Sequence, residues 1–155
     1  MYCLQISGFQ HTGKNIAIVS LGNWLLERGY VHDKGDLIPP RGARTNFKTV
    51  LRHPTLSKRV LLNTASDFKI NADQLLQFYR SHEPIDVLIT SIRDAGIERM
   101  AMENAIRQLR PIQTEEMPLA KISGQRGDFG AALNNYERRV EFLCQFILKA
   151  VPFQL

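Results

Sequence analysis

Long apolar runs are missing from this sequence. None approaches the roughly 18 residues that a membrane-spanning helix needs, and the first residues lack a basic segment followed by a small-residue cleavage site. These absences argue against a helical membrane protein and against a secreted one. We therefore expect a cytoplasmic protein with no membrane partner.

Cysteine is equally scarce, since only Cys3 and Cys144 are present. Both stand in apolar segments, and neither has another cysteine or a histidine at metal-ligand spacing. The sequence therefore indicates neither a disulfide framework nor a zinc site. We expect two buried, reduced thiols.

A concentrated positive charge is also lacking. The net charge of +5 is spread over 20 basic and 15 acidic residues, without a polybasic tail. The balance fits an anionic partner, and phosphate on a small molecule satisfies it as well as nucleic acid does. Base-stacking aromatics among the basic residues are scarce, with only Phe47 available, so nucleic acid is the less favoured partner.

What the chain does contain is a regular alternation of strand-like and helix-like apolar patterns. The predicted strands cover residues 2–7, 59–63, 86–90 and 118–123, and the predicted helices cover 15–28, 71–80, 97–109 and 131–151, with Asn71 as a helix N-cap. Strand-helix repeats of this kind predict an α/β fold with a parallel sheet of about four or five strands, covered by helices on both faces. Because no linker or internal repeat is visible, we expect a single domain over residues 1–155.

Residues 31–58 interrupt the alternation. They combine glycine and proline with a cluster of basic side chains, which is typical of irregular structure. We expect a short helix over residues 46–52 and a functional loop in the remainder.

The most informative segment lies between the first predicted strand and the first predicted helix, where residues 8–15 read GFQHTGKN. Its two glycines allow backbone N–H groups to converge on an anion, and the helix that follows contributes its positive end. This segment resembles the phosphate-binding loop of P-loop NTPases and nucleotide kinases, G-x-x-x-x-G-K-[ST]. The resemblance implies a three-layer P-loop-type fold that binds ATP or GTP with Mg²⁺. It also implies phosphate contacts from Gly8, His11, Thr12, Gly13, Lys14 and Asn15.

The same resemblance implies where Mg²⁺ would be held. The residue after the lysine is Ser or Thr in the family and Asn15 here, whose amide oxygen could ligate a metal. The family's acid at the end of the second strand is matched by Asn63, while Asp67 follows four residues later and Asp94 follows the third strand. Ligands bind at the carboxyl ends of strands in open α/β sheets, so we expect these side chains to face the same crevice as Lys14.

Several further roles are implied only by the family resemblance. Arg93 resembles the kinase arginines that stabilise charge on a transferred phosphate, although an exposed or ion-paired arginine is an equal alternative. Asp36, Arg41 and Arg44 stand where kinases bind the phosphate acceptor, with a solvated surface loop as the alternative. Residues 122–127 correspond to the loop that packs against the nucleotide base, or form a simple turn.

Three functions are compatible with these observations. The first is a small phosphotransferase resembling nucleoside or nucleotide kinases, in which Lys14 and Arg93 stabilise the transferred phosphate and Asp67 or Asp94 assists Mg²⁺. The second is a non-catalytic nucleotide-binding or regulatory module, because asparagine stands at both metal-associated positions. The third, least favoured, is nucleic-acid binding.

Overall fold

The computed structural model describes residues 1–120 and 129–155, and a six-stranded mixed sheet forms its centre. The strand order is β2-β3-β4-β5-β1-β6. Four neighbouring strands run parallel, and β2 and β3 add an antiparallel hairpin at one edge. The strands are β1 (Tyr2–Ser7), β2 (Val31–Gly35), β3 (Lys48–Arg52), β4 (Arg59–Asn63), β5 (Val87–Ile92) and β6 (Gln113–Pro118).

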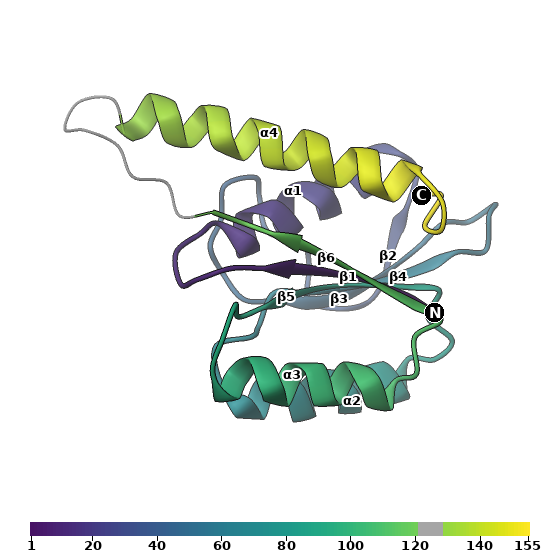
Figure 1. Cartoon of the computed structure of the whole chain (residues 1–155). Coiled ribbons are helices and arrows are strands. Elements are labelled where there is room, and N and C mark those ends of the chain that lie inside the picture. Colours follow the sequence, from purple (N-terminus) through teal and green to yellow (C-terminus); the bar gives the residue numbers. More distant parts are fainter. Residues whose placement is uncertain (121–128) are drawn as a thin grey trace.

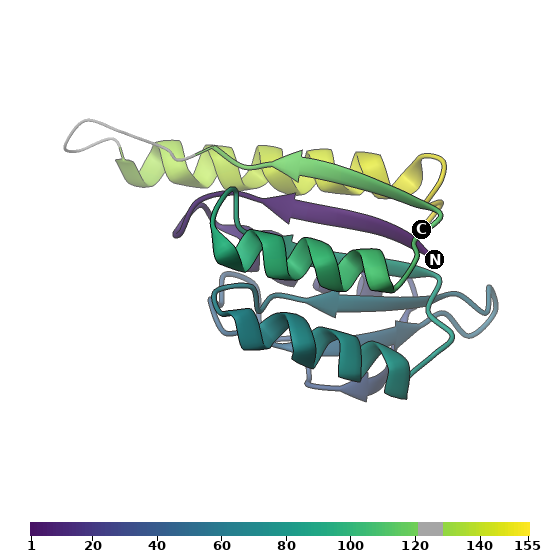
Figure 2. The ribbon, with the colours of Figure 1, turned by 60° about the horizontal axis from the view of Figure 1, so that its bottom comes forward.

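Helices cover both faces of this sheet (Figure 1). One face carries α1 (Lys14–Glu27) and α4 (Phe129–Lys149), and the opposite face carries α2 (Lys69–Ser81) and α3 (Ile97–Gln108). Figure 2 shows α2 and α3 running side by side across the second face. In the part of the chain that the structure describes, no helix is both long enough and apolar enough to cross a membrane.

The parallel strands are buried on both faces because their side chains alternate between two cores. In β4, Val60 and Leu62 pack with α1 and α4, whereas Leu61 packs with α2 and α3. All three are fully buried, and each such side chain contributes about 1.5–3 kcal/mol of burial free energy. A continuous apolar run therefore marks an interior strand, as the sequence predicted for residues 59–63.

The α/β class and the four helices are confirmed, but the prediction of an all-parallel sheet with four or five strands is wrong. The two strands that were not predicted are β2 and β3. They fall in the segment that we expected to be a loop with a helix over residues 46–52. That helix is absent, because Thr49, Val50 and Leu51 are buried as a strand between β2 and β4. β-branched residues fit such a pleated surface better than a helix.

The last strand is also displaced from its predicted position. It covers Gln113–Pro118 instead of residues 118–123, of which residues 121–123 lie outside the described part of the chain. β6 is an edge strand with mostly exposed polar side chains, so no apolar run marks it in the sequence. The prediction of Asn71 as a helix N-cap is wrong by three residues, because α2 starts at Lys69 with Phe68 at the cap.

Both cysteines are free and fully buried, as predicted. Burial raises the pKa of each thiol to about 12, so the reactive thiolate is suppressed near neutral pH. We expect the native protein to show almost no reaction with a disulfide-exchange reagent at about pH 8, and the unfolded protein to show two reactive thiols. Rapid labelling of the native protein would contradict the packing of β1 or α4.

Candidate phosphate-binding site

The loop between β1 and α1 has a backbone that favours glycine at both of its glycine positions. Gly8 has a φ of 155° and Gly13 a φ of 87°, values that side-chain-bearing residues rarely adopt. A Cβ atom at Gly8 would also lie 2.6 Å from the Thr12 Oγ1 and 3.0 Å from the Leu119 carbonyl oxygen. Gly8 is therefore required by both space and conformation, and Gly13 by conformation alone.

Lys14 is the first residue of α1, and its side chain turns back over the loop. Its Nζ donates to the carbonyl oxygens of Gly8 and Phe9, each at 2.7 Å. The loop is tightened further by the Thr12 hydroxyl, which donates to the Phe9 carbonyl at 2.9 Å. The ammonium group is therefore held inside the loop, and Lys14 as a whole residue is only 6% exposed.

The charge on Lys14 is tuned by its surroundings. Burial lowers its pKa, the carboxylates of Asp67 and Asp94 oppose this shift, and the Arg93 guanidinium adds to it. The amine therefore feels the charges of all three side chains, of which Asp67 also lines the cavity beside it.

A cavity of about 490 Å³ opens beside the loop, which is within the usual range for small-molecule sites. It is lined by residues 10–16 of the β1–α1 loop and the start of α1. The other lining residues are Arg44, Asn46, Asp67 and Glu137. Among the described residues, no side-chain cap occupies the N-terminus of α1, so its amide groups and its positive dipole remain available to an anion.

Asn15 ties this cavity to the segment before β3. Its Nδ2 donates to the Asn46 Oδ1 at 2.9 Å and to the Arg44 carbonyl at 3.3 Å. The side-chain oxygen of Asn15 is then the atom that could ligate a metal. This tether was not visible in the sequence, since 31 positions separate the two asparagines.

Asp67 and Arg93 lie together at the carboxyl edge of the sheet. The Asp67 Oδ1 is 3.2 Å from the Arg93 Nε, an ion pair that lacks hydrogen-bond geometry. Asn71 supports this arrangement from the first turn of α2. In the amide orientation that satisfies both partners, its oxygen accepts from the N–H groups of Asp67 and Phe68, each at 3.2 Å. Asp67 therefore lies at the cavity, four residues beyond the end of β4.

Behind these charges, the ends of β4 and β5 are joined by a buried polar network. The Asn63 Nδ2 donates to the Thr90 Oγ1 at 2.9 Å and to the Ala65 carbonyl at 3.1 Å. The Ser91 hydroxyl is 2.7 Å from the Thr64 carbonyl oxygen. Asn63 is fully buried and supports the strand ends, and its Oδ1 meets no hydrogen-bond partner in residues 1–120 and 129–155.

Not every predicted site residue comes to the cavity. Asp36 accepts a hydrogen bond from the Lys48 backbone at 2.9 Å, and Arg41 pairs with Glu27 and Glu141. Arg44 and His11 line the cavity, but Asp36 and Arg41 do not. Arg93 and Asp94 are also not among the lining residues, although both were expected to face the crevice of Lys14. The predicted base-binding segment, residues 122–127, lies outside the described part of the chain.

The cavity also contains residues that sequence reasoning missed. Gln10 lies within the loop and was overlooked only because the motif leaves that position open. Asn46 and Glu137 come from distant segments that packing brings to the loop, and no local pattern in the sequence marks them.

Acidic and imidazole side chains do not gather into a complete metal site in residues 1–120 and 129–155, where no group of three or more His, Cys, Asp or Glu could hold an ion. Mg²⁺ in nucleotide sites is usually held by only one or two carboxylates together with substrate phosphates. Asp67 and Asn15 both line the cavity, and one carboxylate with one amide oxygen fits that sparser kind of site.

When the chain is compared with protein-family models, with curated proteins and with solved structures, none of them matches it, so its likeness to phosphate-binding loops rests on residues 8–15 and their geometry.

Proposed function

We propose that this protein is a cytoplasmic P-loop-type nucleotide-binding protein that acts as a small kinase-like phosphotransferase. The observation that most supports this proposal is the buried amine of Lys14, which lies inside a glycine-dependent loop that borders a cavity of about 490 Å³. Helices on both faces of the sheet agree with a three-layer P-loop fold. The ligand that fits this chemistry is ATP or GTP, and the acceptor is a nucleoside, a nucleotide or another small molecule.

In this proposal, the phosphates lie against the backbone amides of the loop and the N-terminus of α1. Lys14 exchanges its two carbonyl partners for phosphate oxygens, which a positively charged donor binds more strongly. Arg93 stabilises negative charge on the transferred group, and Arg44, which lines the cavity, contacts the acceptor.

Mg²⁺ would be held by Asp67 and the Asn15 oxygen, with Asp94 as the other nearby acid. Bound there, the ion would neutralise phosphate charge. The residues of the chain supply the remaining functions, which are to orient the phosphates and to keep the amine of Lys14 beside them.

A second candidate is a nucleotide-binding module without catalysis. One observation favours it, namely that the Asn15 amide is engaged in holding the Asn46 segment. A side chain whose orientation is fixed by hydrogen bonds to the cavity wall is less free to turn its oxygen toward a metal ion. The two candidates differ in whether nucleotide affinity depends on Mg²⁺ and on Asp67.

Replacing Asp67 with asparagine tests that difference. If the phosphotransferase proposal is right, the Mg²⁺-dependent part of ATP affinity should fall by about 10-fold or more, because a charged ligand is lost. Titration calorimetry with and without Mg²⁺ measures this effect. The control is Asp73→Asn, which removes an exposed carboxylate from α2.

Equal affinity with and without Mg²⁺ in the wild type, unchanged by Asp67→Asn, would reject the phosphotransferase and leave the binding module.

A further inference from the structure

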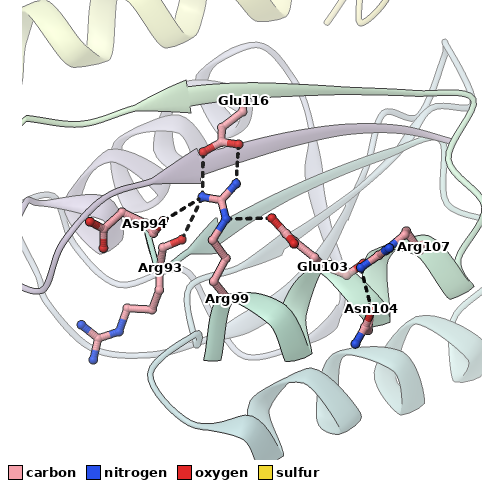
Figure 3. A network of polar contacts seen from close by, with 7 residues as sticks. All are labelled: Arg93, Asp94, Arg99, Glu103, Asn104, Arg107 and Glu116. Atoms are coloured by element: carbon pink, nitrogen blue, oxygen red, sulfur yellow. Dashed lines mark hydrogen bonds and ion pairs between the residues drawn. The ribbon is translucent and has the colours of Figure 1, made fainter. Parts of the chain in front are cut away.

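Arg99, in the first turn of α3, makes the most extensive set of polar contacts near the candidate site (Figure 3). Its Nη1 and Nη2 donate to the two carboxylate oxygens of Glu116 at 3.0 and 2.9 Å, which is a bidentate pair. Its Nε donates to Glu103 at 2.7 Å. All three nitrogens of the guanidinium are therefore engaged, which fixes the orientation of the side chain.

The same guanidinium also holds the loop that follows β5. Its Nη1 donates to the Arg93 carbonyl at 3.2 Å, with the Asp94 carbonyl at 3.5 Å. Figure 3 shows the Arg93 side chain leaving this loop on the side away from the Arg99–Glu116 pair. Arg99 thus fixes the backbone that carries the charged side chains of Arg93 and Asp94.

Glu116 connects Arg99 to β6, the neighbour of the strand that leads into the phosphate loop. It lies in β6, directly opposite Gln5 of β1 and one diagonal step from Ser7, the residue before Gly8. In a parallel pair these positions share one face of the sheet. The Arg99 guanidinium holds the pKa of Glu116 below its usual value. The Leu119 N–H also donates to the Ser7 carbonyl at 2.8 Å, so the end of β6 and the start of the loop are joined by backbone as well.

We propose that Arg99 and Glu116 are positioning residues that fix the loop after β5 relative to the phosphate loop. In the described part of the chain neither lines the cavity, and they act through the backbone of Arg93 and Asp94 and through the pairing of β6 with β1. The inference rests on the proposed function, because the position of Arg93 matters for phosphate chemistry only if phosphate binds at the loop.

A purely structural ion pair is the alternative, and the chain offers a matched control for it. Arg59 also pairs with a carboxylate, that of Asp33, at 2.8 Å, and also donates to two loop carbonyls, those of His82 and Pro84. It stands at the start of β4, and therefore at the edge of the parallel sheet opposite the phosphate loop. The two pairs are partly buried to a similar degree, with 17% and 23% of the side chains exposed in Arg59–Asp33 and 23% and 36% in Arg99–Glu116. Arg59→Gln therefore controls for the loss of a part-buried ion pair.

The test is to measure backbone hydrogen exchange in the ligand-free wild type and in three variants, Arg99→Gln, Glu116→Gln and Arg59→Gln. We expect both Arg99→Gln and Glu116→Gln to exchange about 10-fold faster at residues 8–13 and 93–97, because each breaks the Arg99–Glu116 pair that links the loop after β5 to β6, whose end is hydrogen-bonded to the start of the phosphate loop. Arg59→Gln should leave these two loops at wild-type rates. Arg99→Lys should restore protection only in part, because an ammonium group cannot bind Glu116 and the two carbonyls in the same fork.

A second measurement determines ATP affinity for the same variants. We expect Arg99→Gln and Glu116→Gln to weaken ATP binding about 5- to 10-fold at unchanged thermal midpoint, with Arg59→Gln like the wild type.

Wild-type exchange in both loops of Arg99→Gln, or an increase spread over the whole chain, would overturn the positioning role even if ATP binds normally. Localised exchange in a protein that binds no ATP would instead uphold the mechanical link and reject the proposed function.

Discussion

Replacing Lys14 with alanine is expected to weaken ATP or GTP binding about 10- to 100-fold, the effect of losing one or two hydrogen bonds to a charged partner. The amine is buried in the loop and already forms two bonds of 2.7 Å to carbonyl oxygens. Phosphate oxygens are stronger acceptors for the same group. Titration calorimetry measures the loss directly.

The control for Lys14→Ala is Lys34→Ala, which removes the same charge from an exposed position on β2. It should bind nucleotide like the wild type. If both variants lost affinity equally, the effect would be one of net charge, and Lys14 would have no specific role.

The lowered pKa of Lys14 adds a pH dependence. Because burial lowers the pKa, the free protein loses the positive charge at a lower pH than an ordinary lysine does. Nucleotide affinity should therefore decline as pH rises through that lowered pKa, and the decline should be absent in Lys14→Ala.

Replacing Gly8 with alanine is expected to damage both the loop and the fold around it. The new Cβ would lie 2.6 Å from the Thr12 Oγ1 and 3.0 Å from the Leu119 carbonyl, at a φ of 155°. Overpacking and backbone strain of this kind each cost about 1–3 kcal/mol. Urea unfolding should show the loss of stability, and calorimetry should show no nucleotide binding.

Gly13→Ala provides the matched comparison. A Cβ at Gly13 would meet nothing within 4 Å, so only its φ of 87° opposes the change. We expect a cost of about 1–2 kcal/mol from the left-handed backbone, smaller than that of Gly8→Ala. A Gly8→Ala protein as stable and as active in binding as the wild type would contradict the loop geometry.

The interior of the fold could be predicted from the sequence because it consists of continuous apolar strands. Residues 2–7 and 59–63 match β1 and β4 at both ends. The edge strands could not be predicted in this way, because the burial of their side chains depends on partner strands elsewhere in the chain. Val50 and Leu51 become a strand only by pairing with β4, and Glu115 and Glu116 of β6 stay polar because an edge strand faces solvent.

The candidate site divides in the same way. Gly8, Gly13 and Lys14 are local to one loop, so their spacing sufficed to predict their arrangement. Asp67 and Arg93 were predicted to share its crevice because each follows the carboxyl end of a strand. Asp67 lines the cavity, whereas Arg93 pairs with Asp67 but is not among the lining residues. Contacts that join distant segments, such as the Asn15–Asn46 tether and the Arg99–Glu116 pair, depend on packing that no local pattern encodes.

The most direct test of nucleotide binding is the thermal unfolding of the wild-type protein with ATP and with GTP, each with and without Mg²⁺. A ligand that binds only the native state stabilises it by RT ln(1 + [L]/Kd), which is about 2.7 kcal/mol at a concentration 100 times Kd. Our account predicts a rise in the thermal midpoint with at least one nucleotide, larger when Mg²⁺ is present. No rise with either nucleotide would contradict it.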